Sequence, residues 1–384
     1  MHRLRIAYLQ DATMSYSPGA NGTQKPLGLT RSFSAYIVCP ADAVLYREIE
    51  EGAQVIRGIH KSGRSLPRRL APIPENLRLL RRVKLRDGLD AVYTGIHLSG
   101  LISGFLARKL LGVKWIADCW DHPYAALAEK GGAAARVILW LRWHVEGWLL
   151  RHADLVVLNI HPDVLAPMRL RDGRLLALKN GVLVSRLAKI GQESTPQAAL
   201  LGVVANVSEA KRGDFALRAL AEIRKIIPNA RLRLIGEIDA GYAWKLDQTI
   251  RHLHLETAIE LTGWRPYEEA MRLAAECSIL LYCYPDIPRL RWNYVLKIGE
   301  YHALRRPVVA VDLPGARALI RHEETGLICD PDSPEDMAKK AITLLQQPDL
   351  WAKISSNAAS AAKELDWTLI LDRINSRIAA LLNQ

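Results

Sequence analysis

The sequence predicts an α/β protein built from two doubly wound domains. A chain of 384 residues is longer than one typical domain, so two domains are the natural expectation. Short, continuous apolar runs alternate along the chain with segments of helical periodicity, which is typical of parallel sheets covered by helices. Apolar residues make up 49% of the chain and charged residues 24%, which supplies enough apolar material for a sizeable core.

The first domain is expected to span residues 1–190. Its expected strands are 4–9, 35–39, 54–56, 90–93, 114–119 and 153–158, and its expected apolar helices are 101–111 and 133–150. Segment 11–30 is rich in Gly, Ser, Pro and Asn and predicts a long loop, a kind of segment that is commonly functional. Trp140, Trp143 and Trp148 are interpreted as core residues, with a membrane interface as the alternative.

Positive charge is concentrated in this first domain. Residues 1–190 contain 28 Lys and Arg against 15 Asp and Glu, whereas the rest of the chain contains 24 against 25. Segment 57–86 contains ten basic residues and one acid, Glu75, interleaved with leucines at near-helical spacing. This composition predicts a surface that lies on an anionic membrane. A solvated charged face and a nucleic-acid surface are the alternatives, and the few aromatic side chains disfavour nucleic acid.

The chain carries no sequence feature of export or of membrane spanning. It contains no run of eighteen apolar residues, and its first residues lack a signal-peptide core. We therefore expect a cytoplasmic protein that is peripheral on the inner face of the cytoplasmic membrane. The cysteines form no C-x-x-C pair and are expected to be reduced core residues. They are Cys39, Cys119, Cys277, Cys283 and Cys329.

The second domain is expected to span residues 198–365, after a mixed polar segment at 185–197 that is interpreted as a linker. Its expected strands are 200–204, 231–235, 259–261, 278–283 and 308–311, and its expected helices include 215–226, 268–276 and 294–304. Segment 366–384 has an amphipathic pattern and is expected to form a C-terminal helix.

Stretch 294–315 carries the most specific pattern in the chain. Its first half has helical spacing and places Lys297 and Glu300 three residues apart on one face. Pro307 stops this helix, and the apolar run Val308–Val311 predicts a strand buried on both faces. Ligands bind at the carboxyl ends of strands in open parallel sheets, so both charged side chains are expected beside a ligand crevice.

This stretch resembles the nucleotide-sugar site of the family-four glycosyltransferases, also called group 1, which are retaining enzymes with the GT-B fold. Their pattern is K-x-x-E-y-x-A-x-x-x-P-V-V-A, followed by T-G and a later P. The matching residues are Lys297, Glu300, Tyr301, Ala303, Pro307–Ala310, Thr325, Gly326 and Pro331. An earlier Glu found in many members is Trp292 here, which leaves the sugar-hydroxyl contacts unassigned.

The resemblance covers roughly residues 90–384, with 200–345 the most specific part. It implies two Rossmann-like, doubly wound domains that face a central cleft. It also implies that the helix at 366–384 crosses back to the first domain.

The resemblance assigns the donor site residue by residue. Glu300 is expected to accept hydrogen bonds from the ribose hydroxyls of a nucleotide sugar. Lys297 and Lys211 are expected to stabilise the diphosphate as negative charge develops on the leaving group. The arginine that the family carries before Lys211 is replaced here by Asn206, and Arg212 is expected to supply that cation instead.

The resemblance also assigns residues outside this cluster. Arg265 lies in a loop that holds the nucleotide base in the family. Asp121 and His122 match a position that faces the acceptor and the donor sugar, so a catalytic or acceptor-binding role is expected; the alternative is a pair that caps the next helix. Gly19 and Gly22 lie in the first loop, which approaches donor and acceptor with its backbone, and a surface loop without a role is the alternative.

These features imply a retaining glycosyltransferase that moves a sugar from a nucleoside diphosphate sugar to a lipid-linked or glycan acceptor in surface polysaccharide or glycoconjugate biosynthesis. No cofactor and no metal are expected, because lysines and helix N-termini can stabilise the diphosphate; the D-x-D at Asp330–Asp332 is interpreted as a structural turn. The alternatives are a sugar-nucleotide epimerase of the same fold and a non-catalytic basic protein that binds nucleic acid or membrane. Nucleic acid is not expected as a partner.

Overall fold

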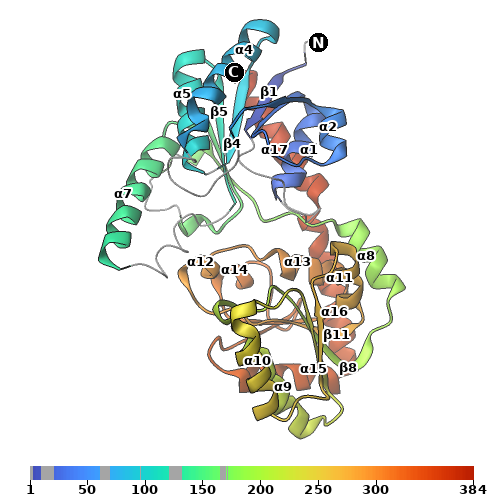
Figure 1. Cartoon of the computed structure of the whole chain (residues 1–384). Helices are drawn as coiled ribbons and strands as arrows, with labels where there is room; N and C mark the ends of the chain where they lie inside the picture. The colour runs from blue at the N-terminus through green and yellow to red at the C-terminus, as the bar shows by residue number, and fades with distance from the viewer. Residues whose placement is uncertain are drawn as a thin grey trace. The chain divides into compact units, whose positions relative to one another are not determined.

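The computed structural model describes residues 3–9, 21–60, 70–95, 97–120, 132–164, 170 and 172–384. The chain divides into two compact units, each with its own parallel sheet (Figure 1). Unit 1 consists of Met1–Asn180 together with Thr368–Gln384, and unit 2 consists of Gly181–Trp367. Two α/β units with parallel sheets confirm the predicted fold class.

The sheet of unit 1 has seven parallel strands in the order β3-β2-β1-β4-β5-β6-β7. They are β1 (Arg5–Leu9), β2 (Ser34–Cys39), β3 (Gln54–Arg57), β4 (Ala91–Gly95), β5 (Lys114–Cys119), β6 (Leu155–Leu158) and β7 (Leu175–Ala177). The order runs outward in one direction from β1 and in the other from β4, so a topological switch point lies between them. These two strands pair with Tyr8 opposite Tyr93.

Helices cover both faces of this sheet. They are α1 (Asn21–Ser32), α2 (Arg47–Gly52), α4 (Pro72–Asp87), α5 (Leu98–Leu111), α7 (Ala133–Leu150) and α17 (Trp367–Leu382), with short 3₁₀ turns η1 (Pro162–Val164) and η3 (Asp172–Arg174). Parallel crossovers are right-handed, so the reversal of strand order puts α1 and α2 on one face and α4, α5 and α7 on the other (Figure 1). α17 packs beside α1, where Asn375 Nδ2 donates to Gly28 O over 3.1 Å.

The segment predicted as a loop at 11–30 is partly helical, because α1 begins at Asn21. Lys25 and Leu29 of this helix are each 1% exposed. Burial of one face outweighs the low helix propensity of its glycines and of Pro26, which lies inside the helix. The first half of the segment lies outside the described residues.

The interpretation of the α7 tryptophans as core residues is wrong for Trp140 and Trp148, which are 60% and 46% exposed. Apolar residues surround this helix on most sides, so the sequence pattern did not indicate which side faces the sheet. None of the helices in the described ranges is both long and apolar enough to cross a bilayer.

The five cysteines lie in the cores of the two units. All are buried and none is in a disulfide, which confirms the prediction of free core residues. Burial raises the pKa of Cys277 and of Cys283 to about 12. Both thiols are therefore protonated at neutral pH and poorly nucleophilic.

The sheet of unit 2 has six parallel strands in the order β10-β9-β8-β11-β12-β13. They are β8 (Gln197–Val204), β9 (Arg231–Ile235), β10 (Ile259–Gly263), β11 (Cys277–Tyr282), β12 (Val308–Val311) and β13 (Leu327–Cys329). The helices are α8 (Val184–Glu193), α9 (Gly213–Ile226), α10 (Ala240–His252), α11 (Tyr267–Ala275), α12 (Pro288–Arg291), α13 (Leu296–Ala303), α14 (Pro314–Arg317), α15 (Pro334–Gln346) and α16 (Pro348–Ala362). Short 3₁₀ turns are η4 (Glu209–Lys211) and η5 (Lys363–Leu365).

The predicted linker at 185–197 is mostly helix α8, which packs on α11 and α13. Leu187 and Ile190 are buried at helical spacing. Gly191 lies so close to α13 that a Cβ atom there would be 2.3 Å from Leu304 O. The linker prediction was wrong because polar residues outnumber these few apolar contacts in the segment.

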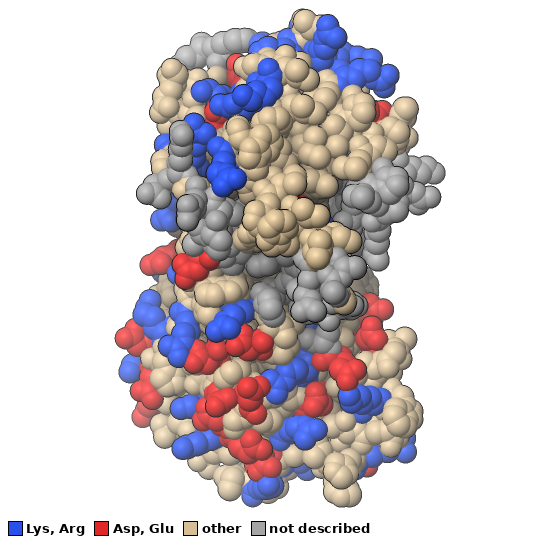
Figure 2. Space-filling model, turned by 90° about the vertical axis from the view of Figure 1, so that its left-hand side faces the viewer, with Lys and Arg blue, Asp and Glu red and all other residues tan. Residues whose placement is uncertain are grey.

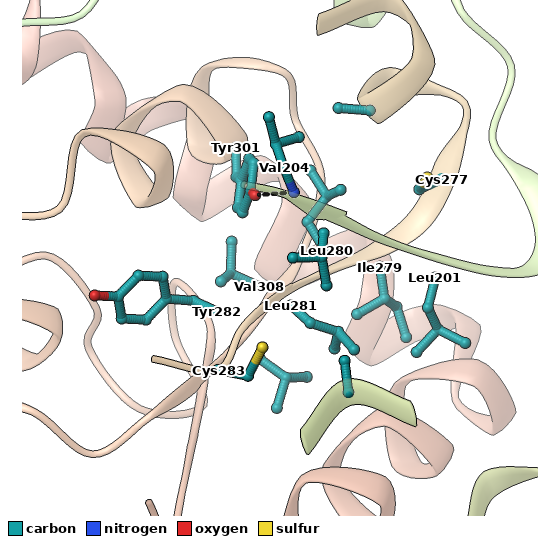
Figure 3. Packing of buried hydrophobic residues seen from close by; sticks show 14 of the residues in the cluster. Leu201, Val204, Cys277, Ile279, Leu280, Leu281, Tyr282, Cys283, Tyr301 and Val308 are labelled. Atoms are coloured by element: carbon teal, nitrogen blue, oxygen red, sulfur yellow. Dashed lines mark hydrogen bonds between the residues drawn. The ribbon is translucent and has the colours of Figure 1, made fainter. Parts of the chain in front are cut away.

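The core of unit 2 is centred on β8 and β11 (Figure 3). Leu201 of β8 pairs with Ile279 of β11, and both are buried. Tyr301 of α13 reaches this core, and its hydroxyl oxygen accepts a hydrogen bond from the Val204 N–H over 3.0 Å. This bond ties α13 to the carboxyl end of β8.

Candidate functional site

The candidate site lies at the carboxyl ends of the strands of unit 2, where α13 begins. Lys297 and Glu300 lie in the first two turns of this helix. Glu300 is 0% exposed, and each of its carboxylate oxygens accepts a hydrogen bond. Lys297 Nζ donates to Oε2 over 2.9 Å, and Tyr267 Oη donates to Oε1 over 2.9 Å. A buried carboxylate requires such partners because an unpaired charge in the interior is costly.

Tyr267 supplies its hydrogen bond from α11, of which it is the first residue. Burial is the main cause that raises the pKa of its hydroxyl far above the ordinary value, and the charge of Glu300 is the second. The hydroxyl therefore keeps its proton and donates to the carboxylate. Tyr267 was not among the predicted site residues, because it lies 33 positions from Glu300 in the chain. In the sequence, only its position directly after the Gly263–Pro266 loop indicated that it could lie at the site.

Arg265 lies in that loop, and its guanidinium interacts locally. Its Nε lies 3.0 Å from Glu269 Oε1, and its Nη1 donates to Trp264 O over 3.0 Å. The side chains of Arg265 and Glu269 are 40% and 53% exposed, so this ion pair contributes little to stability. The structure therefore places Arg265 at the surface, two residues before the tyrosine that contacts Glu300.

Lys211 and Arg212 follow β8, and their side chains contact different segments. Lys211 Nζ lies 5.5 Å from the centroid of the Tyr284 ring, in the loop after β11. Arg212 has a left-handed backbone with φ of 51°. Its Nη1 donates to Pro331 O over 2.5 Å and lies 3.3 Å from Asp332 Oδ1. Arg212 is thus engaged with the turn before α15, whereas Lys211 lies against the loop that leads towards α13.

Glycine lets the loops at this edge approach one another closely. Gly236, after β9, has φ of +140°, and a Cβ atom there would lie 2.0 Å from Ala205 O. Its N–H donates to Gly263 O over 3.1 Å. The loops after β8, β9 and β10 are therefore held together with no side chain between them, and their backbone groups can approach a ligand directly.

This edge of unit 2 thus combines lysines, a buried carboxylate and closely spaced backbone. Ammonium groups suit phosphate oxygens, and a carboxylate suits a pair of hydroxyls such as those of a ribose. The arrangement fits a ligand that carries both kinds of group. Within the described ranges, no cluster of three His, Cys, Asp or Glu side chains could hold a metal ion.

The predicted residues of unit 1 are described only in part. Asp121, His122 and Gly19 lie outside the described residues. Gly22 is the second residue of α1. The strand that leads towards Asp121 and His122 is β5, and its last five residues are buried.

A buried ion pair in unit 1 was not predicted. Lys25 Nζ of α1 lies 2.5 Å from Asp118 Oδ1 of β5 and donates to Asn159 Oδ1, after β6, over 2.6 Å. These side chains are fully or almost fully buried. Burial lowers the pKa of Lys25 and raises the pKa of Asp118, while their mutual attraction opposes both shifts. The pair joins α1 to the carboxyl ends of β5 and β6.

A model of the protein family described as "Glycosyl transferases group 1" matches residues 198–347, which contain Lys211, Lys297 and Glu300. A D-inositol 3-phosphate glycosyltransferase of Nocardioides sp. is 24% identical over 308 residues, which cover 72% of this chain and 64% of that protein. Another, from Rhodococcus jostii, is 25% identical over 221 residues, which cover 53% of this chain and 44% of that protein. The chain therefore spans less than two thirds of the length of these two curated relatives.

Solved structures of HepE from Anabaena are similar to the whole chain. The complex with UDP gives a TM-score of 0.72 at 19% identity and covers 98% of this chain and 100% of that one. The complex with UDP-glucose gives a TM-score of 0.71 with the same coverage. At this identity the likeness establishes the fold, which is GT-B, as the sequence predicted.

Proposed function

We propose that the chain is a group 1 glycosyltransferase, as the match over residues 198–347 supports, and that it transfers a sugar from a nucleoside diphosphate sugar, with retention of configuration, to a lipid-linked or glycan acceptor. The observation that carries the proposal is the cluster of Glu300, Lys297 and Tyr267. It places a carboxylate and an ammonium group together at the carboxyl edge of a parallel sheet.

In this proposal, Glu300 accepts hydrogen bonds from the ribose hydroxyls of the donor. Its side chain is 1% exposed, and that of Lys297 is 29% exposed. In this proposal, the ribose replaces Lys297 as a hydrogen-bond partner of Glu300. The ammonium group of Lys297 then contacts the diphosphate. Tyr267 stays in place and holds the carboxylate in position.

The diphosphate is neutralised by Lys297 and Lys211, which take the role that a metal ion has in other enzymes. Arg212 takes part only if it leaves its contact with Pro331. Arg265 is assigned to the loop that holds the base. A uridine nucleotide is favoured over a guanosine nucleotide because HepE, which shares the fold, has been solved with UDP and with UDP-glucose.

The acceptor is assigned to unit 1 on the grounds of charge. Unit 1 contains 28 Lys and Arg against 16 Asp and Glu, a net charge of +12, whereas unit 2 contains 24 of each. An anionic acceptor suits unit 1. Asp121 and His122 are the residues assigned to its contact or to catalysis, and Gly19 and Gly22 are assigned to backbone contacts with donor and acceptor.

Two anionic acceptors are candidates. A lipid-linked intermediate of surface polysaccharide at the inner face of the cytoplasmic membrane fits the basic helix α4. An inositol phosphate is favoured by the names of the curated relatives. Sugar transfer assayed with each acceptor in parallel distinguishes them.

The donor site is tested by thermal shift with UDP, GDP, ADP and their sugars. One nucleotide is expected to raise the melting temperature, because it binds only the folded state. Glu300→Ala should abolish the shift, whereas Glu256→Ala, which changes an exposed carboxylate of the same unit, should keep it. A shift of equal size in both variants contradicts the assignment of Glu300. Conversion of the donor sugar without any acceptor would instead support an epimerase.

A further inference from the structure

The outward surface of α7 is apolar, which is unusual for a surface helix. Between residues 137 and 150, the exposed described side chains are Val137, Ile138, Trp140, Leu141, His144, Val145 and Trp148. All except His144 are large and apolar, with exposed fractions from 46% to 60%. Surface helices ordinarily turn polar residues outward. These seven residues, here called the α7 stripe, are therefore a candidate contact surface.

The charged residues in this part of α7 are withdrawn from the stripe. Arg142 Nε lies 2.6 Å from Glu146 Oε1, and their side chains are 19% and 0% exposed. His144 Nδ1 lies 2.7 Å from Trp140 O, on the helix itself. The stripe therefore presents an apolar surface to whatever covers it, and the ion pair of Arg142 and Glu146 lies largely buried beside it.

A basic surface lies in the same helix layer, because α4 packs on α5 and α5 packs on α7 (Figure 1). The outward face of α4 consists of exposed side chains, most of them arginines: Arg78, Arg81, Arg82, Leu85 and Arg86. Arg78 and Arg86 lie near acidic neighbours of their own helix, whereas Arg81 and Arg82 form no ion pair with any described residue. Figure 2 shows this side of unit 1, with Lys and Arg gathered above a broad uncharged surface.

We propose that the α7 stripe inserts into the interfacial layer of an anionic phospholipid bilayer while the arginines of α4 contact the lipid headgroups. Tryptophan is enriched at this layer of membranes, and the stripe contains Trp140 and Trp148. This inference rests on the proposed function and deepens it, because it names the element that holds the enzyme where a lipid-linked acceptor lies.

Charge decides between a bilayer and a second copy of the chain as the partner. Contact between two copies through the α7 stripe would bring together two units that each carry a net charge of +12. Such like charges repel, whereas an anionic lipid surface attracts them. The arginines of α4 thus match the anionic headgroups of a bilayer, and the α7 stripe matches its acyl region.

The test is sedimentation of the full chain with vesicles of equal parts phosphatidylglycerol and phosphatidylcholine. Trp140→Ser/Leu141→Ser should weaken vesicle binding about tenfold or more, because two exposed apolar side chains no longer enter the lipid. Trp244→Ser is the matched control, since Trp244 is 75% exposed on α10 of unit 2, and it should bind as the wild type does. High salt should weaken the part of vesicle binding that the arginines supply and leave the part that the α7 stripe supplies.

Three outcomes overturn the inference. They are a stripe variant that binds vesicles as tightly as the wild type, a wild type that does not bind them, and a wild-type dimer that the stripe variant converts to a monomer. A UDP thermal shift on the same samples separates this failure from that of the proposed function. A retained shift without vesicle binding overturns only the membrane inference, whereas the absence of any nucleotide shift overturns the donor site.

Discussion

At the scale of single residues, Glu300 determines the character of the candidate site. Its carboxylate is fully buried, and two donors from two helices satisfy it. One donor is a protonated, half-buried tyrosine, and the other is a lysine that reaches towards solvent. This asymmetry gives the carboxylate one fixed partner and one that a ligand can replace.

Tyr267→Phe tests the fixed partner. The variant leaves a buried carboxylate oxygen without its hydrogen bond, and such a loss costs about 1–3 kcal/mol. We expect the free energy of unfolding in urea to fall by that amount and UDP to bind more weakly, since the carboxylate is no longer held in position. An unchanged free energy of unfolding would mean that the oxygen finds another donor.

The sequence predicted part of this cluster and could not predict the rest. Lys297 and Glu300 lie three residues apart on one helix, so their contact follows from helical spacing alone. Tyr267 comes from another helix, and only the folded sheet brings α11 beside α13. The roles of these residues in binding a nucleotide sugar stay predictions.

At the scale of elements, the ion pair of Lys25 and Asp118 fixes how α1 packs on the sheet of unit 1. Both groups lose their hydration on burial, so each charge destabilises the folded protein when its partner is missing. A Lys in a segment rich in Gly and Pro was interpreted as part of a surface loop, because a sequence pattern does not reveal a partner 93 positions away.

Lys25→Met tests this pair. Removal of one member of a buried ion pair costs about 3–5 kcal/mol, which urea unfolding at neutral pH should detect. Burial raises the pKa of Asp118 above its ordinary value of 3.8. The cost of the unpaired carboxylate is therefore present above the folded pKa and disappears as the pH falls below 3.8, where the group is protonated in both states.

The double variant Lys25→Met/Asp118→Asn is the control for this prediction. It removes the uncompensated charge, so it should recover part of the stability at neutral pH and show a weaker pH dependence. Equal stability losses in the single and double variants would contradict a charge effect and indicate lost packing instead.

Elements differ in how well the sequence predicted them. The strand at Val308–Val311 was confirmed with the predicted bounds, because a short apolar run ended by a proline on one side is a clear pattern. Helix α8 was missed because its buried residues are few. In α7 the apolar residues were recognised, but their abundance concealed which of them face solvent.

At the scale of the whole molecule, unit 1 is basic and unit 2 is neutral. The alternation of strands and helices was enough to predict the fold class, because each unit repeats the connection of one strand through a helix to the next parallel strand. Unit 1 is built from two separate parts of the chain, because Thr368–Gln384 belongs to it as well as Met1–Asn180. Ile370, Leu371, Ile374 and Ile378 of α17 are each at most 4% exposed.

A chain shortened to end at Trp367 tests this division. Loss of α17 removes buried aliphatic side chains from unit 1, at a cost of about 1.5–3 kcal/mol for each one. We expect a lower unfolding temperature and faster proteolysis of unit 1. The UDP thermal shift should persist, because Lys211, Lys297 and Glu300 all lie in unit 2. Loss of the nucleotide shift together with an intact unit 1 would contradict this prediction.

The path of the chain also sets the order in which the two units are finished during translation. The residues of unit 2, Gly181–Trp367, are synthesised before residues 368–382 of α17. Unit 1 is begun before unit 2 and completed after it, because Leu371 and Asn375 cannot cover α1 until α17 has been synthesised. Domains commonly fold as units during synthesis, so unit 2 is expected to fold while unit 1 still lacks α17.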